Sequence, residues 1–210
     1  MKSVKVAKQA SKPLTSPVLI LVEGSDEKFF IEAMCAHWFP EKINDITIEN
    51  VEGSNNFSTH FEALTIRSSK SLRAIGIITD SEENPDATKQ RWNDLFVKFP
   101  QKCVCKKLQL PSDDQAGAFE TLALTAVSNN PIVKCATDFR DCVVEKIGKR
   151  TLAQKDKIVV QAWLSAELGN AYANLFKAQE KNPDKKLLDY DHPAFTSIKT
   201  FIADLLTHKE

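Results

Sequence analysis

The sequence lacks any long apolar run. None of its hydrophobic stretches approaches the ~20 residues that a helix needs to cross a bilayer, and the N-terminal region has no apolar segment like that of a secretory signal peptide. Cysteine is also sparse, and an odd count of five suits a reducing compartment better than a disulfide framework. We therefore expect a cytoplasmic protein with no membrane partner.

An excess of charge of either sign is absent as well. The 210 residues include 28 basic and 28 acidic side chains, so the net charge indicates no particular partner. Residues 1–16 do contain lysines without any acid. A flexible, solvated chain end explains this segment, and contact with a phosphate backbone is the alternative.

Several motifs that identify enzyme classes are missing. There is no G-x-x-x-x-G-K-[ST] loop, so the chain carries no P-loop ATPase, and no Ser-His-Asp or Cys-His arrangement can be read. Cys103 and Cys105 form a C-x-C pair, but "KCVCKKLQL" alternates like a strand and no second pair of ligands lies at zinc-finger spacing. Zinc is therefore not expected.

What is present is an alternation of strands and helices. Short apolar runs rich in β-branched residues predict four strands, at residues 17–22, 46–51, 71–80 and 103–110. Helical spacing follows the first three of them, and the first helix begins near Ser25, which we expect to be its N-cap. Such alternation predicts an α/β fold with a parallel sheet of about four strands flanked by helices.

The pattern changes after Gly117, where the remaining segments have helix-like spacing and no further clear strand. The least certain of these segments contains "KIVV". We therefore predict three parts: a basic N-terminus at residues 1–16, an α/β domain at 17–127, and a helical C-terminal extension at 128–210 that packs on the same domain.

Acidic residues gather after the predicted strands. They are Glu23 and Asp80 at strand ends, Glu82 in the loop after Asp80, and Asp113, Asp114 and Glu120 after the fourth strand. In parallel sheets, ligands bind beyond the carboxyl ends of the strands. Carboxylates at one edge repel one another unless a cation neutralises them, and oxygen ligands favour Mg²⁺ or Mn²⁺. Such ions typically promote phosphoryl transfer.

Two segments resemble a known domain. "LILVEGSDEKFFIEAM" at residues 19–34 and "AIGIITDSEEN" at residues 74–84 resemble the Toprim domain of topoisomerases, primases and OLD-type (overcoming lysogenization defect) nucleases. The chain is more similar still to an uncharacterised family of stand-alone Toprim-like proteins related to the OLD group. That similarity includes "PSDDQAGAFETLAL" and "AWLSAELGNAYANLFKAQ" and extends over nearly the whole chain. It implies a Toprim-like Rossmannoid fold.

The resemblance also implies roles for individual residues. Glu23 falls on the Toprim glutamate, which is a metal ligand or a general acid or base. Asp80 and Glu82 fall on the D-x-D motif, and Glu120 falls on a further acid that OLD-type nucleases use for a second metal. The motif here is D-S-E, and the longer glutamate changes the geometry offered to Mg²⁺, so one and two ions both remain open.

Other residues near the predicted site have weaker signals. Gly24 serves either the site or the turn, and Lys28 is a candidate phosphate partner. Gly53 begins either a phosphate-facing nest or an ordinary strand-to-helix turn with Asn caps. Asp113 and Asp114 belong either to the site or to the start of the following helix, where negative charge interacts favourably with the helix dipole.

Two functions follow from these observations. The first is a Mg²⁺- or Mn²⁺-dependent nuclease acting on DNA or RNA, with Glu23, Asp80 and Glu82 as catalytic and metal-binding residues and Glu120 as a further ligand. The second is a Toprim-like binding or regulatory module that works with a separately encoded ATPase. The zero net charge favours the second, because nucleic-acid-binding domains often carry a basic surface. The D-S-E motif also favours it, because it departs from the D-x-D motif of Toprim domains.

Overall fold

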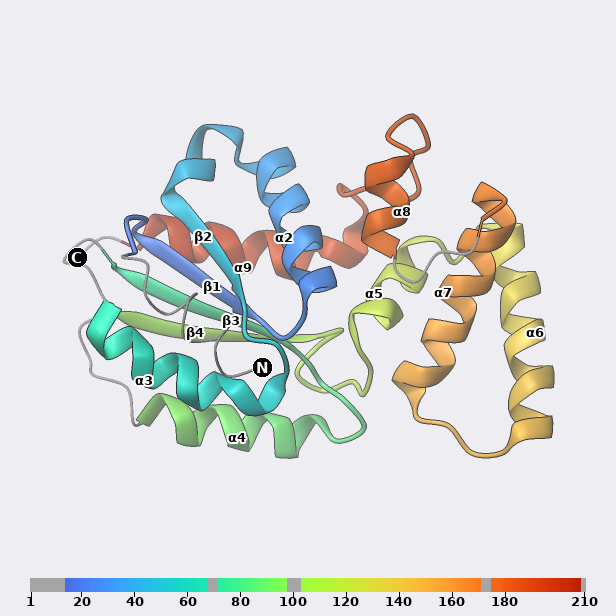
Figure 1. Ribbon diagram of the computed structural model, residues 1–210, viewed down its shortest axis with the longest axis horizontal. Coiled ribbons are helices and arrows are strands. Elements are labelled where there is room, and N and C mark those ends of the chain that lie inside the picture. The colour runs from blue at the N-terminus through green and yellow to red at the C-terminus, as the bar shows by residue number, and fades with distance from the viewer. Residues whose placement is uncertain (1–13, 68–71, 98–102, 171–174, 209–210) are drawn as a thin grey trace, which may run out of the picture. The chain divides into compact units, whose positions relative to one another are not determined.

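The computed structural model describes residues 14–67, 72–97, 103–170 and 175–208 (Figure 1). The predicted basic segment at 1–16 therefore lies largely outside the described residues. At its end, Leu14 and Ser16 are buried, and the Ser16 hydroxyl donates to the Asn44 carbonyl at 3.2 Å.

The centre of the fold is a four-stranded sheet in the order β2-β1-β3-β4. The strands are β1 (Val18–Val22), β2 (Ile46–Asn50), β3 (Ala74–Asp80) and β4 (Val104–Leu110). β1 pairs in parallel with both β2 and β3. β4 runs parallel to β3, because Val104 N–H donates to the Arg73 carbonyl at one end and Ser81 N–H donates to the Leu110 carbonyl at the other. The α/β fold with a parallel sheet is confirmed.

Helices connect and flank these strands. The helices in the first half of the chain are α2 (Ser25–Trp38), α3 (Phe57–Arg67) and α4 (Pro85–Val97), with the short 3₁₀ helices η1 (Pro40–Asp45) and η2 (Ser54–Asn56). Ser25 is the first residue of α2 and not its N-cap, so that prediction was wrong by one residue. Gly24 is the N-cap and provides no side-chain acceptor.

The remaining segments are helical, as the spacing predicts. They are α5 (Phe119–Ala126), α6 (Pro131–Ile147), α7 (Leu152–Leu168), α8 (Leu175–Lys181), η3 (Pro193–Phe195) and α9 (Thr196–Thr207). The uncertain "KIVV" segment lies inside α7. The helix-like spacing of "AYANLFKAQEK" also begins in residues 171–174, which lie outside the described part of the chain.

Both faces of the two central strands are covered, which explains why β1 and β3 are almost continuously apolar. Alternate side chains of β1 and β3, namely Leu19, Leu21, Ile75 and Ile77, belong to a cluster with buried residues of α3 and α4. On the other face, α9 lies so close to β3 that a Cβ at Gly76 would meet Leu205 and Phe201 at 2.5 and 3.0 Å. Figure 1 shows α3 and α4 on one side of the sheet and α2 and α9 on the other.

The chain forms two compact units that do not follow sequence order. The first contains residues up to 79, residues 89–108 and residues from 198 onward; the second contains residues 80–88 and 109–197. Most of α9 thus belongs to the unit that holds most of the sheet, while the predicted boundary between 127 and 128 stays a prediction. Within the described residues, no helix is both long enough and apolar enough to span a membrane.

Candidate functional site

Glu23 follows β1 and is in contact with the end of β3. The hydroxyl of Thr79 donates a hydrogen bond to Glu23 Oε1, and Thr79 itself is buried. The register of the two strands, with Val22 opposite Ile78, brings these residues side by side. Glu23 is therefore a half-buried carboxylate with a defined partner, not a freely solvated acid.

Gly24 follows Glu23 and is the N-cap of α2. Its backbone is extended (φ −129°, ψ 173°), a conformation that any residue adopts, so a turn does not require glycine here. The Glu27 carboxylate occupies the place where a side chain at position 24 would begin. Lys28, the candidate phosphate partner, pairs instead with Glu32 one turn later, at 3.6 Å.

Gly53 belongs to a tight turn that contacts the Glu23 backbone. Glu52 and Gly53 both have positive φ, 58° and 115°, and Gly53 N–H donates to the Glu23 carbonyl at 2.8 Å. Asn50 and Asn56 complete the turn through hydrogen bonds to the N–H and the carbonyl of Glu52. Asparagine side chains thus support the turn, and a phosphate-facing nest at Gly53 stays a prediction.

Asp80, the last residue of β3, is held by the start of α5. Its Oδ1 accepts a hydrogen bond from Phe119 N–H at 2.9 Å. The first N–H groups of a helix have no partner within the helix, and the N-terminus carries partial positive charge. Asp80 therefore accepts the hydrogen bond of one of these N–H groups, and this bond fixes the orientation of its carboxylate.

The D-S-E loop after β3 is connected to the loops after β4. Glu82 has φ 55° and exchanges two backbone hydrogen bonds with Gly117, at 2.9 and 2.8 Å, while its side chain is exposed. The buried Ser81 hydroxyl donates to the Ser112 carbonyl at 2.7 Å. The central serine of the motif is thus structural, and it determines where the two flanking acids are presented.

Asp113 and Asp114 lie in the loop after β4, before α5 begins at Phe119. Asp114 N–H donates to Ser112 Oγ at 3.3 Å, and its side chain is exposed, whereas Asp113 is half-buried. Neither residue is in the first turn of α5. Their proximity in sequence to Ser112 places them beside the D-S-E loop, within the same unit.

Glu120 lies in the first turn of α5 and is mostly shielded from solvent. Its side chain is 18% exposed and forms an ion pair with Lys157 of α7 at 3.6 Å. Glu120 is therefore not a fully exposed acid on the surface of α5. A metal bound at Glu120 would have to compete with this lysine.

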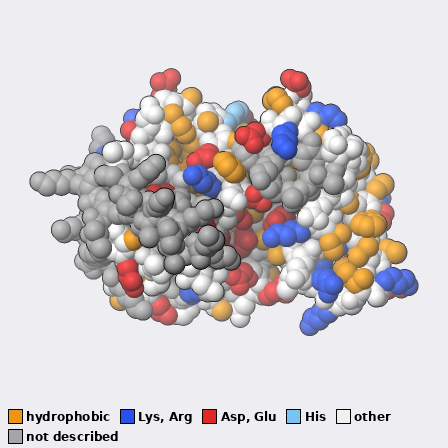
Figure 2. Space-filling view, viewed as in Figure 1, with side chains coloured by type: hydrophobic (Ala, Val, Ile, Leu, Met, Phe, Trp, Pro, Cys, Tyr) orange, Lys and Arg blue, Asp and Glu red, His pale blue; other side chains and the backbone are white. Residues whose placement is uncertain are grey.

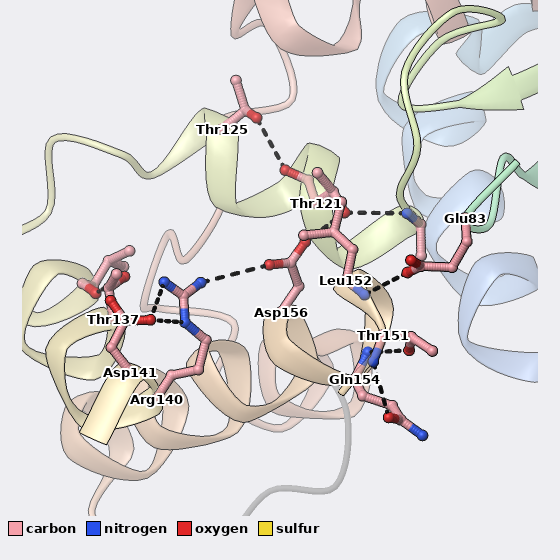
Figure 3. A network of polar contacts seen from close by, with 12 residues as sticks. Glu83, Thr121, Thr125, Thr137, Arg140, Asp141, Thr151, Leu152, Gln154 and Asp156 are labelled. Atoms are coloured by element: carbon pink, nitrogen blue, oxygen red, sulfur yellow. Dashed lines mark hydrogen bonds and ion pairs between the residues drawn. The ribbon is translucent and has the colours of Figure 1, made fainter. Parts of the chain in front are cut away.

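Sequence reasoning missed a buried polar network next to Glu120. Asp156 of α7 is 5% exposed and accepts a hydrogen bond from the Thr121 hydroxyl at 2.5 Å, while Arg140 of α6 approaches its other oxygen at 4.0 Å (Figure 3). Thr121 Oγ1 also accepts from Ala118 N–H at 3.1 Å. Burial raises the pKa of Asp156, against the opposing effects of the Thr121 hydrogen bond and the Arg140 charge. The network fixes the first turn of α5, the same turn that holds Asp80.

A signal for this buried acid was present in the sequence. Asp156 is spaced three, four and seven residues before Val159, Val160 and Trp163, all of which are buried. Four residues at that spacing lie on one face of a helix. An aspartate on the apolar face of α7 needs a polar partner from another element, and Thr121 provides it.

The chain matches one family model over residues 17–207, which is nearly its whole length. It belongs to the family described as protein of unknown function (DUF3226). Neither the curated proteins nor the solved structures contained a match. Any function must therefore be argued from the site itself.

The candidate metal ligands near the strand ends all bind through oxygen. The acids around the strand ends are carboxylates with hydroxyl and backbone neighbours, a donor set that suits a hard cation. In the part of the chain that the structure describes, no three or more His, Cys, Asp or Glu side chains are grouped as a ready metal site. Cys103 and Cys105 pack against the apolar cluster of the first unit.

Proposed function

We propose that the protein is a Mg²⁺- or Mn²⁺-dependent phosphoryl-transfer enzyme of the Toprim/OLD type, acting on nucleic acid phosphodiesters. The observation that carries the proposal is the parallel pairing of β1 and β3 with Val22 opposite Ile78. Glu23 follows the end of one strand and Asp80 ends the other, as the resemblance to Toprim domains implies. Ligand sites of parallel sheets lie at such strand ends.

The residues that would hold the ion are Glu23, Asp80 and Glu82, with Glu120 as the ligand for a second ion. A bound divalent ion would supply activation of water and stabilisation of the leaving oxygen. The protein's own contribution is orientation. The Thr79 hydroxyl holds the Glu23 carboxylate, and Phe119 N–H restricts rotation of the Asp80 carboxylate.

The test is cleavage of end-labelled single- and double-stranded DNA and RNA with millimolar Mg²⁺ or Mn²⁺ and with EDTA. We expect ion-dependent cleavage that Glu23→Gln and Asp80→Asn each lower by about a hundredfold or more, because even an outer-shell partner of a metal is worth about ten- to a hundredfold. The exposed acids Glu41 and Asp184 provide isosteric controls, Glu41→Gln and Asp184→Asn, that should keep full activity. Unchanged turnover in a folded Asp80→Asn variant would remove the proposal.

A binding or regulatory module that acts with a separate ATPase is the second candidate. Two of the acids already interact with protein groups, which favours this candidate. Asp80 accepts a hydrogen bond from Phe119 N–H, and Glu120 forms an ion pair with Lys157. A thermal melt separates the two candidates, since an ion that binds the native state raises its stability by mass action. A higher melting temperature in Mg²⁺ or Mn²⁺ that Asp80→Asn removes supports the enzyme, and no shift supports the module.

A cytoplasmic location belongs to the same proposal. All five cysteines, Cys35, Cys103, Cys105, Cys135 and Cys142, are free thiols in the structure, and the last two are exposed. Exposed free thiols persist best in a reducing compartment.

A further inference from the structure

The connection between α6 and α7 concentrates positive charge in a chain whose net charge is zero. From Lys146 to Lys155 there are four basic residues and no acidic one. Three of them, Lys146, Lys149 and Arg150, lie at the exposed turn and are called here the basic connection. Figure 2 shows Lys and Arg side chains gathered over this part of the second unit, at the lower right of the view.

Among the residues that the structure describes, two of these charges have no acidic partner. Lys146 pairs with Glu145 at 2.8 Å, but both side chains are 71% exposed, so solvent screens that pair strongly. Lys149 and Arg150 pair with no acid among the residues that the structure describes, and the Arg150 guanidinium donates to the Lys149 carbonyl at 3.1 Å. Both charges are therefore exposed to solvent and to its dissolved anions.

The turn presents these side chains on an open surface. Gly148 ends α6 with φ 88°, and a Cβ at that position would meet nothing within 4 Å. Ile147, beside it, is 50% exposed. Nothing in the described part of the second unit packs over the turn, so a ligand as large as a nucleic acid strand can reach it.

The basic connection is also tied to the acidic loop. Thr151 and Gln154 form a capping box that starts α7 directly after the turn. Glu83, the residue after the D-S-E motif, accepts a hydrogen bond from Leu152 N–H at 2.6 Å (Figure 3). One turn further along α7, Lys157 pairs with Glu120. Within the second unit, the basic turn thus sits at a fixed position relative to Asp80 and Glu82.

We propose that the basic connection binds the phosphate backbone of a nucleic acid. A polyanion releases condensed counterions when lysine and arginine neutralise its phosphates, and exposed side chains without acidic partners are suited to that exchange. The choice of nucleic acid over other polyanions rests on the proposed function, because the turn is fastened to the loop that carries the proposed phosphodiester-cleaving acids. Protein groups that bind phosphates position a strand without reading its sequence.

The experiment measures binding of a fluorescein-labelled oligonucleotide by anisotropy, in EDTA, so that neither metal nor cleavage is required. Lys149→Ala/Arg150→Ala should weaken binding about tenfold near physiological salt and reduce the slope of log K against log salt by about 2, or roughly 0.9 for each phosphate that is no longer neutralised. The control is Lys134→Ala/Lys186→Ala, which removes two exposed charges elsewhere in the same unit and should change neither quantity. Melting temperatures confirm that both variants fold.

Three results would overturn the proposal: equal weakening by both double variants, unchanged binding by Lys149→Ala/Arg150→Ala, and binding of phosphatidylserine vesicles without binding of any oligonucleotide. Failure of the proposed function is distinguishable from these. An absence of ion-dependent cleavage, together with oligonucleotide binding that the Lys149 and Arg150 substitutions weaken, would remove the enzyme and leave the binding surface in place.

Discussion

Both compact units bury apolar side chains, and in the second a polar network around α5 lies beside them. In the first, the rings of Phe57 and Trp92 pack edge to face, with their centroids 4.4 Å apart. Both belong to a cluster of buried apolar side chains between the sheet and the helices α3 and α4. In the second, the contacts around α5 include the carboxyl group of Asp156, the Thr121 hydroxyl and the Arg140 guanidinium.

Apolar packing and the hydrogen-bonded network differ in whether they can orient a particular polar group. Apolar packing is non-directional, and it holds β1 and β3 in place without orienting any functional group. A hydrogen-bonded network is directional, and here it determines how the first turn of α5 presents Phe119 N–H to Asp80. Apolar packing therefore stabilises the sheet and its helices, whereas the polar network fixes how the first turn of α5 meets Asp80.

The largest expected effect is in the apolar core. Trp92→Ala should lower the free energy of unfolding by about 3–5 kcal/mol, because it removes a large side chain that is only 1% exposed and leaves a cavity. Chemical denaturation followed by circular dichroism measures the loss. Val97→Ala is the control on the same helix: Val97 is 86% exposed, so its loss should stay within about 0.5 kcal/mol. Equal losses would contradict the description of this cluster as a packed core.

A smaller effect is expected in the polar network. Thr121→Val preserves the shape of the side chain but removes the donor to Asp156 and the acceptor of Ala118 N–H, which should cost about 1–3 kcal/mol. Faster hydrogen exchange at the Ala118 and Phe119 amides would locate the damage in the first turn of α5. Thr125→Val, which removes an exposed hydroxyl bonded to the Thr121 carbonyl, should cost far less. A neutral Thr121→Val would show that the network does not order this turn.

The smallest effect is a dependence of stability on pH. Burial raises the pKa of Asp156 above the ordinary value of 3.8, so the folded state retains a proton that the unfolded chain has lost. The resulting stabilisation is complete below pH 3.8 and disappears as the pH rises through the higher pKa of the folded state. The stability of wild type relative to Asp156→Asn should therefore fall from acid toward neutral pH.

Denaturation of both proteins at a series of pH values measures this difference, with Asp184→Asn as the matched substitution of an exposed acid. The charged groups that face Asp156 are Arg140 on α6 and Lys155 on α7 itself. A difference that rises with pH would mean that these cations outweigh burial and that folding lowers the pKa of Asp156.

The strands and helices were predictable because their signals are local. The apolar runs of β1 and β3 are continuous, and each is followed by polar turn residues and a helical pattern. Even there, the N-cap of α2 was misplaced by one residue, since Ser25 is a common N-cap type but Gly24 leaves the room that the Glu27 carboxylate uses.

The candidate site was predictable only in part. Parallel pairing places Glu23 near the end of β3, where the Thr79 hydroxyl donates to it, and a site shared with Asp80 stays a prediction. The partners of the other acids did not follow: Phe119 is 39 residues from Asp80, and Leu152 is 69 residues from Glu83. Hydrogen bonds over such separations depend on how the helices pack, which the periodicity of each helix does not reveal.

The sequence by itself determined the class of fold, the order of its elements, and the types of residue at the strand ends, because backbone propensity and apolar periodicity act over a few neighbouring residues. Only the tertiary structure decided that Asp156 is buried beside Thr121, that Lys157 covers Glu120, and that Glu83 holds the start of α7 next to the basic connection. Those contacts arise where separate helices bury their faces against one another, and the free energy of a buried charge depends on the particular group it meets there.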